Sequence, residues 1–221
     1  MKLKVILCFS FLGLCFINFC QAPINDDCSN AIFLCYDDDT SGSNINATLD
    51  TCSNCSDWDS TSLWIQTTQQ GLDTVYYDSS LCFQLNNSVW YKFRTNDDGG
   101  DINITINNIT CSGDTNSDFS NELQAAVIKP NIDCDYTSYE LVSSCVSGSD
   151  EIQIPCYGLG RDYVYYIVVD GGNLNNGTLT SSAECGFRIS INGAGVNPSV
   201  SAGNDLWTNS NEGIELQGES L

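Results

Sequence analysis

The sequence contains no histidine, and this absence excludes several kinds of active site at once. Without imidazole the chain cannot build Ser-His-Asp or Cys-His catalytic groups, histidine metal sites or the usual general base near neutral pH. Carboxylate catalysis needs two acids that face each other across a cleft, and no spacing among the 28 acidic residues singles out such a pair. Gly158-Leu159-Gly160 lacks the lysine and helix of a phosphate-binding loop. We therefore expect a protein that is not an enzyme.

Basic residues are also scarce. Seven Lys and Arg stand against 28 Asp and Glu, which gives a net charge of −21. Such a surface repels phosphate backbones and anionic lipid headgroups, because attraction to either needs clustered Lys and Arg. The composition therefore argues against a nucleic-acid partner. Most of these acids are expected to form a solvated surface that attracts cations.

The chain has no apolar run long enough for a membrane-spanning helix, but it begins with a shorter one. Lys2 and Lys4 precede the apolar stretch 5–19, and acidic residues follow soon after it at Asp26 and Asp27. A membrane span needs about 20 apolar residues, so this pattern predicts a secretory signal peptide over residues 1–20. We expect a secreted, extracellular protein, with attachment to the cell surface as the alternative. No membrane insertion is expected after the leader is cleaved.

Export changes how the cysteines are interpreted. Of the 13 cysteines, three lie in the leader, which leaves ten in the exported part. An even number of cysteines in an oxidising compartment favours disulfides over metal ligation. The ten expected to form five bridges are Cys28, Cys35, Cys52, Cys55, Cys82, Cys111, Cys134, Cys145, Cys156 and Cys185. Spacing does not fix the pairing, although the neighbours Cys134 and Cys145 are the first choice. Cys52 and Cys55 resemble half of a zinc or redox motif, but the chain has no second such pair, so a structural bridge is favoured.

Apolar residues alternate with a period of two from residue 88 onward, which predicts β-strands. The alternating positions are Val89, Tyr91 and Phe93; Ile102, Ile104 and Ile106; Leu123, Ala125 and Val127; Tyr139, Leu141 and Ser143; Ile152 and Ile154; Tyr163 to Val169; and Phe187, Ile189 and Ile191. The turn 96–100 predicts a hairpin between the first two strands, and Pro155 is expected to end the fifth. These short strands predict an all-β fold, an antiparallel sandwich or jelly roll stapled by disulfides with one inner face per sheet.

The segment from Tyr36 to Leu85 interrupts this rhythm and carries cysteines and aromatics among many polar residues. We expect a long cysteine-rich loop insertion with a strand or two. Because long loops on rigid sandwiches commonly bind ligands, its aromatics Trp58, Trp64, Tyr76 and Tyr77 are the candidate binding residues. The alternative is that these rings only fill a small satellite core.

Three sequence stretches carry a family resemblance. They are Asn25-Asp26-Asp27-Cys28-Ser29-Asn30-Ala31-Ile32, Ser88-Val89-Trp90-Tyr91-Lys92-Phe93-Arg94-Thr95 and Tyr163-Val164-Tyr165-Tyr166-Ile167-Val168-Val169-Asp170-Gly171. In this order they resemble the bacterial pre-peptidase C-terminal domain, a small β-sandwich module of proteins secreted by gliding bacteria. The resemblance covers residues 25–191 and implies a β-sandwich over residues 21–193. The insertion from Cys52 to Tyr77 departs from the family's pattern.

A second resemblance concerns the tail. Asn197-Pro198-Ser199-Val200-Ser201-Ala202-Gly203-Asn204-Asp205 and Gly213-Ile214-Glu215-Leu216-Gln217-Gly218 resemble the opening of a polycystic-kidney-disease-type immunoglobulin-like repeat. Such a repeat needs roughly 80–100 residues, so residues 194–221 are interpreted as a linker and a truncated repeat, with further domains of the same polypeptide beyond it. The alternative is an edge strand that the tail adds to the first sandwich.

Calcium is the most plausible cofactor, because hard cations bind several carboxylate and carbonyl oxygens. Two acidic clusters are candidate sites: Asp37, Asp38 and Asp39 after Cys35, and Asp97, Asp98 and Asp101 around a turn. Neither matches the Asp-x-Asp-x-Asp-Gly loop with its distal glutamate, and solvated turn aspartates are the competing interpretation.

Three functions from different classes remain. The leading one is a non-catalytic extracellular binding or adhesion module that recognises a polysaccharide or a surface protein. The second is an accessory domain of a secreted protease or glycoside hydrolase whose catalytic domain lies outside this chain. The third is a structural spacer without a ligand.

Overall fold

The computed structural model describes residues 21–49, 85–112, 120–135, 138–172 and 182–198, together with the backbone of residues 65–68, 75–78, 174–175 and 178–179. The fold is almost entirely β, as the period-two alternation predicted. The described part contains one short 3₁₀ helix, η1 (Cys28–Asn30). Among these residues, no helix is long and apolar enough to cross a membrane.

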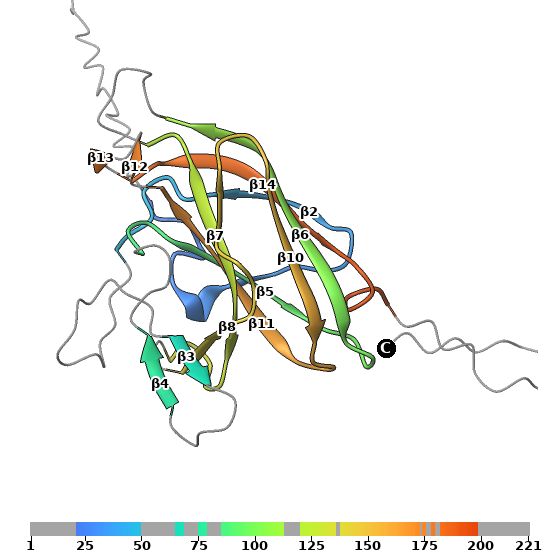
Figure 1. Ribbon diagram of the computed structural model, residues 1–221. Coiled ribbons are helices and arrows are strands. Elements are labelled where there is room, and N and C mark those ends of the chain that lie inside the picture. Colours follow the sequence, from blue (N-terminus) through green and yellow to red (C-terminus); the bar gives the residue numbers. More distant parts are fainter. Residues whose placement is uncertain are drawn as a thin grey trace, which may run out of the picture.

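Two sheets form the body of the protein (Figure 1). The larger sheet has the order β1 (Ile32–Phe33), β5 (Val89–Arg94), β11 (Val164–Gly171), β7 (Leu123–Pro130), β8 (Tyr139–Leu141), β3 (Ile65–Thr68) and β4 (Val75–Asp78), with β9 (Val146–Gly148) also paired to β7. The smaller sheet has the order β10 (Ile152–Leu159), β6 (Gly100–Cys111), β14 (Cys185–Asn192) and β2 (Asp39–Ser43). Among the described strands, β12 (Leu174–Asn175) and β13 (Thr178–Leu179) pair only with each other.

The main core lies between these two sheets. Alternate residues of β5, β7 and β11 meet alternate residues of β6, β10 and β14, and all of them are buried. The Tyr91 ring, for example, packs edge-on against Phe187 of the opposite sheet with 6.2 Å between ring centroids. The strands form because their apolar side chains repeat every two residues and so lie on one face. The prediction of an all-β sandwich is confirmed.

The larger sheet is also buried on its outer face, which the sequence analysis did not anticipate. Trp90, Tyr166 and Val168 lie on this face with Tyr139 of β8, and Cys28 of η1 packs against them. On β11 every residue after Val164 is buried, whereas on β5 the outward Trp90 is buried, Lys92 is half-buried and Arg94 is exposed. One inner face per sheet was therefore wrong for this sheet, because the N-terminal segment folds over it.

The expected hairpin between residues 88 and 107 was also wrong. The strand β5 pairs with β1 and β11, whereas β6 pairs with β10 and β14, so the turn 96–100 crosses from one sheet to the other. Asn96 shapes this connection, because its Oδ1 accepts hydrogen bonds from the N–H groups of Asp98 (3.1 Å) and Gly99 (2.9 Å). Gly99 adopts φ 65°, a conformation that favours glycine. Alternation identified both strands but could not show which strands pair.

Pro155 does not end its strand, contrary to expectation. The strand β10 continues through Pro155 to Leu159, with Pro155 opposite Asn103 of β6. Because β10 lies at the edge of its sheet, a residue without an N–H group is tolerated there.

The disulfides follow only part of the expected scheme. Cys28 pairs with Cys134, so the predicted bridge between Cys134 and Cys145 was wrong. Cys111 pairs with Cys185 directly opposite on the neighbouring strand, and Cys145 is disulfide-bonded as well. Cys52, Cys55 and Cys82 lie outside the described residues.

Cys35 and Cys156, which we expected in bridges, are free. The connection that carries Cys35 leads into β2, whereas Cys156 is buried on β10 at the other edge of the smaller sheet, with β6 and β14 between these edges. A disulfide needs Cα atoms within about 7 Å. An even number of cysteines does not show which of them lie within that reach.

Residues 193–197, assigned to a linker and tail, contact the connection between the sheets. The N–H of Gly195 donates to the carbonyl of Asp101 (3.0 Å), and the carbonyl of Gly195 accepts from the N–H of Asn96 (2.8 Å). The side-chain amide of Asn96 also donates to the carbonyls of Ala194 (2.7 Å) and Asn197 (2.8 Å). This stretch is therefore held against the sandwich at least as far as Asn197.

Candidate binding pocket

The aromatic residues chosen from the sequence do not form a described site. Trp58 and Trp64 lie outside the described residues, and of Tyr76 and Tyr77 only the backbone is described. Both tyrosines lie on β4, which pairs with β3 at one edge of the larger sheet. Their role as binding residues stays a prediction.

The first acidic cluster, Asp37 to Asp39, is exposed, and the guanidinium group of Arg188 pairs with one of its carboxylates. Arg188 donates from Nε to both carboxylate oxygens of Asp39 (2.7 Å each) and from a terminal nitrogen to the Asp39 carbonyl (2.8 Å). This pairing raises the pKa of Arg188, with the hydrogen bonds to Asp39 as the main cause. Asp37 and Asp38 are exposed beside this pair.

The second acidic cluster is divided by its contacts. Asp101 accepts a hydrogen bond at Oδ1 from the N–H of Gly158 (2.8 Å), whereas Asp97 and Asp98 are exposed in the turn. Within the described ranges, no group of three or more metal-ligating side chains comes together. Calcium binding at either cluster stays a prediction.

One buried acid has a structural role. Asp170 lies at the end of β11, and its Oδ2 accepts hydrogen bonds from the N–H groups of Asn86 (2.9 Å) and Asn87 (3.1 Å) and from the Ser88 hydroxyl (2.7 Å). A buried carboxylate requires such donors. These bonds hold the chain that enters β5, so Asp170 is explained by the fold rather than by catalysis.

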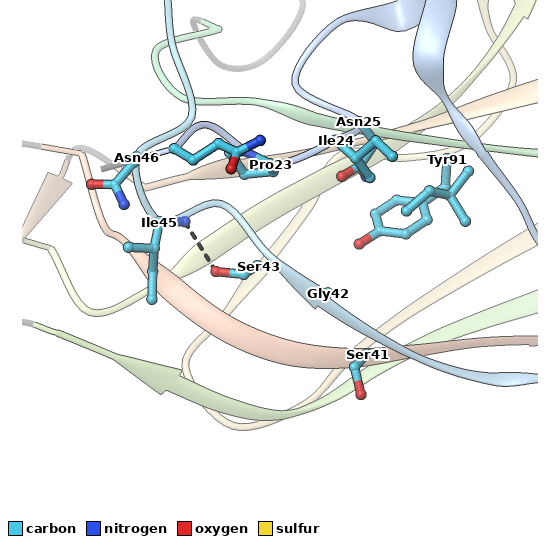
Figure 2. A pocket seen from close by; sticks show the side chains of 11 residues that line it. Pro23, Ile24, Asn25, Ser41, Gly42, Ser43, Ile45, Asn46 and Tyr91 are labelled. Atoms are coloured by element: carbon cyan, nitrogen blue, oxygen red, sulfur yellow. Dashed lines mark hydrogen bonds between the residues drawn. The ribbon is translucent and has the colours of Figure 1, made fainter. Parts of the chain in front are cut away.

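The structure contains a pocket that the sequence analysis did not predict. It lies where the N-terminal segment 21–25 and β1 of one sheet approach β2 of the other, and its volume is about 420 Å³ (Figure 2). Its lining residues are Gln21, Pro23, Ile24, Asn25, Ile32, Ser41, Gly42, Ser43, Ile45, Asn46 and Tyr91. No lining residue is charged, although the chain carries a net charge of −21. Ile24 and Ile45 present apolar surface to solvent at its rim.

Tyr91 of β5 places a hydroxyl group at the pocket. The side chain is completely buried, and its hydroxyl makes no bond of hydrogen-bond geometry with the described residues. Burial raises the pKa of Tyr91 to about 12, and the Asn25 side chain, which lies near the hydroxyl but outside hydrogen-bond geometry, opposes this rise. The Asn25 amide is already engaged, because its Nδ2 donates to the Trp90 carbonyl (2.9 Å). In Figure 2 the Tyr91 hydroxyl points into the space between β2 and the N-terminal segment.

Gly42 gives this hydroxyl its space. A Cβ atom at position 42 would collide with the Tyr91 hydroxyl and with the ring of Phe187. Only glycine therefore lets β2 approach so closely. The pocket depends on this close approach, because Gly42 and Tyr91 both line it.

The strand β2 contributes an open sheet edge to the same place. Among the described strands, only β14 pairs with β2. The N–H of Asn44 donates to the carbonyl of Cys185 (3.1 Å), and this register directs the N–H and C=O groups of Ser41 and Ser43 away from β14. The pocket thus combines apolar surface, one buried hydroxyl and backbone groups of a free edge.

Acidic residues flank this uncharged pocket. Asp26 follows Asn25, Asp39 lies two residues before Ser41, and the Glu184 carboxylate accepts from the N–H of Asn46 (3.4 Å). Arg188 of β14 is paired with Asp39 and so neutralises that carboxylate. A ligand that enters the pocket therefore meets neutral walls with the carboxylates of Asp26 and Glu184 nearby.

The lining side chains are uncharged, so the pocket offers a ligand apolar contacts and hydrogen bonds. The sequence signal for the pocket was weak: Tyr91 was assigned to the core by alternation, and Asp39-Thr40-Ser41-Gly42-Ser43 has no apolar pattern that predicts a strand.

No protein-family model matches the chain, and no curated protein matches it either.

Proposed function

We propose that this chain is a non-catalytic extracellular binding or adhesion module, part of a secreted or cell-surface multidomain protein, that recognises a surface protein or a carbohydrate. The observation that supports it best is the pocket between β2 and the N-terminal segment, with the unpartnered Tyr91 hydroxyl at it. Ligand sites are typically concave and mostly apolar with a few well-placed polar groups, and this pocket has that composition.

Export is part of the proposal and has its own support. The first 20 residues have the pattern of a secretory leader, and the bridges Cys28–Cys134 and Cys111–Cys185 are of a kind that persists in oxidising compartments. A rigid disulfide-linked sandwich is a suitable support for a binding surface outside the cell.

The test uses the secreted chain after leader removal, applied to glycan arrays and to arrays of extracellular proteins, each with calcium or with a chelator. We expect specific binding that Tyr91→Phe and Ile24→Ser both weaken. Ile24 is 80% exposed, so its substitution leaves the fold intact. Tyr157→Ser is the matched control, because Tyr157 is 75% exposed on β10 at the opposite edge of the smaller sheet.

Three outcomes are informative. Binding that falls in both pocket variants and persists in the control supports the proposal, and a loss on chelation adds calcium as a cofactor. Binding that is unchanged in both pocket variants places the site elsewhere on the chain. No binding to either array favours a structural spacer.

A further inference from the structure

We propose that the pocket binds an extended peptide strand that pairs with the free edge of β2, with uncharged side chains in the pocket and basic residues on either side. This inference rests on the proposed function and names the ligand class of the same site.

The backbone of β2 supplies the first argument. Ser41 and Ser43 direct their N–H and C=O groups away from β14, and no other described strand takes them up. Edge strands with free hydrogen-bonding groups accept an added strand, and this is a common mode of peptide recognition. The open stretch of edge is short, because the Asp39 carbonyl, two residues before Ser41, already accepts a hydrogen bond from Arg188.

The position of the pocket supplies the second argument. A strand added beside β2 would extend the smaller sheet, and its inward side chains would face the N-terminal segment and β1 of the larger sheet. Pro23, Ile24 and Ile32 lie there and line the pocket. Successive side chains of a strand point to opposite faces, so alternate peptide residues would enter the pocket.

The Tyr91 hydroxyl supplies the third argument. A buried hydroxyl without a hydrogen-bond partner destabilises the unliganded protein. The hydroxyl packs directly against Gly42 of β2, and both residues line the pocket, so the hydroxyl lies beside the edge that the peptide would join. An incoming peptide group that hydrogen-bonds to the hydroxyl removes this destabilisation on binding, which makes the hydroxyl a point of affinity.

Charge selects the kind of peptide. The lining is uncharged, whereas Asp26 and Glu184 lie next to lining residues and the whole chain carries −21. A peptide with Lys or Arg on both sides of an uncharged centre complements this pattern and is steered toward it. A second copy of this chain is disfavoured, because it would bring the same large negative charge to the interface.

The test uses three synthetic peptides and the secreted chain after leader removal. The probe is Lys-Lys-Thr-Val-Thr-Val-Thr-Lys-Lys. The second peptide replaces its lysines with glutamates, and the third replaces the central threonine with proline, which removes a backbone N–H group. Fluorescence polarisation measures Kd, and amide hydrogen exchange by NMR reports on individual residues of β2.

We expect the probe to bind and to slow amide exchange at Ser41 and Ser43. The acidic peptide and the proline peptide should bind at least about tenfold more weakly. Ser41→Pro removes one N–H of the free edge and should weaken the probe at least about tenfold, whereas Ser41→Ala, which keeps that N–H, should stay within about twofold. Circular dichroism checks that Ser41→Pro is folded, and the exchange data on the unmodified chain decide the question if it is not.

Two results would overturn the inference. The first is that the probe leaves exchange at Ser41 and Ser43 unchanged. The second is equal binding of the basic, acidic and proline peptides. If glycan binding still depends on Tyr91 in either case, the proposed function stands with a sugar as ligand. If the peptide fails in this way and neither array shows any binding, both proposals fail.

Discussion

Tyr91 combines two environments in one side chain. Its ring is part of the main core against Phe187, while its hydroxyl lies at the pocket without a described partner. Tyr165 on the adjacent strand shows the usual arrangement, because its hydroxyl accepts a hydrogen bond from the N–H of Gly160 (2.9 Å). The two tyrosines therefore form a matched pair for testing what an unpartnered hydroxyl costs.

We expect Tyr91→Phe to leave the free energy of unfolding unchanged or to raise it by about 1 kcal/mol, because the substitution removes a buried polar group without a partner. Tyr165→Phe should lower it by about 1 kcal/mol, because the Gly160 N–H loses its acceptor. Urea denaturation of both variants measures the difference. An equal loss in both would show that the Tyr91 hydroxyl is hydrogen-bonded in the folded protein.

The free cysteines should differ in reactivity. The thiolate is the reactive form, and burial raises the pKa of Cys156 to about 12, so this thiol stays protonated at pH 8. We expect a thiol reagent to label exposed Cys35 rapidly in the folded protein and to label Cys156 only as the protein unfolds. Peptide mass spectrometry over time locates both labels, and Cys35→Ser should remove the fast one. Fast labelling of Cys156 would contradict its buried position.

At the level of elements, the sequence predicted strands well and their pairing poorly. Alternation identified β5, β6, β7, β11 and β14 because their inward positions are apolar. It missed β2, whose Asp39-Thr40-Ser41-Gly42-Ser43 is a strand because of its pairing with β14. It also placed β5 and β6 in one hairpin, since a turn composition does not show whether the chain stays in its sheet. The pocket could not be predicted for the same reason: it depends on which edges meet.

The close approach of β2 to the core gives a prediction at this scale. Gly42→Ala should lower the free energy of unfolding by about 1–3 kcal/mol, because the new methyl group overlaps the Tyr91 hydroxyl and the Phe187 ring. Gly186 on the neighbouring strand has open space at its Cβ position, so Gly186→Ala should be neutral or slightly stabilising. Thermal and urea unfolding compare the two. Equal effects would mean that β2 moves easily and that the pocket is not fixed by Gly42.

At the level of the whole molecule, negative charge far exceeds the cations available to balance it. Among the described residues, ion pairs join Arg94 to Asp162, Lys129 to Glu140 and Arg188 to Asp39, all partly or largely exposed. Exposed pairs contribute little to stability, whereas a net charge of −21 disfavours a compact state.

Fold class and acidity were evident from the sequence, but the bridge from Cys28 to Cys134 was not, because it links positions far apart in the chain.

Salt should therefore stabilise the protein. We expect Tm to rise by about 2–4 °C when sodium chloride is raised from ~10 mM to ~0.5 M, because screening weakens the repulsion among acids more than it weakens the few ion pairs. Differential scanning calorimetry in the two buffers measures this shift. A fall in Tm would show that the ion pairs outweigh the repulsion.

The two mapped bridges enclose overlapping stretches of chain, and this limits how far the protein extends under mechanical load. The shortest covalent route leads from Cys28 to Cys134, back along the chain to Cys111 and across to Cys185. At about 3.5 Å per residue the stretch from Cys111 to Cys134 spans ~80 Å, against ~550 Å for a reduced chain from Cys28 to Cys185. A tether built from this domain would thus lengthen little under shear even after its sheets had come apart.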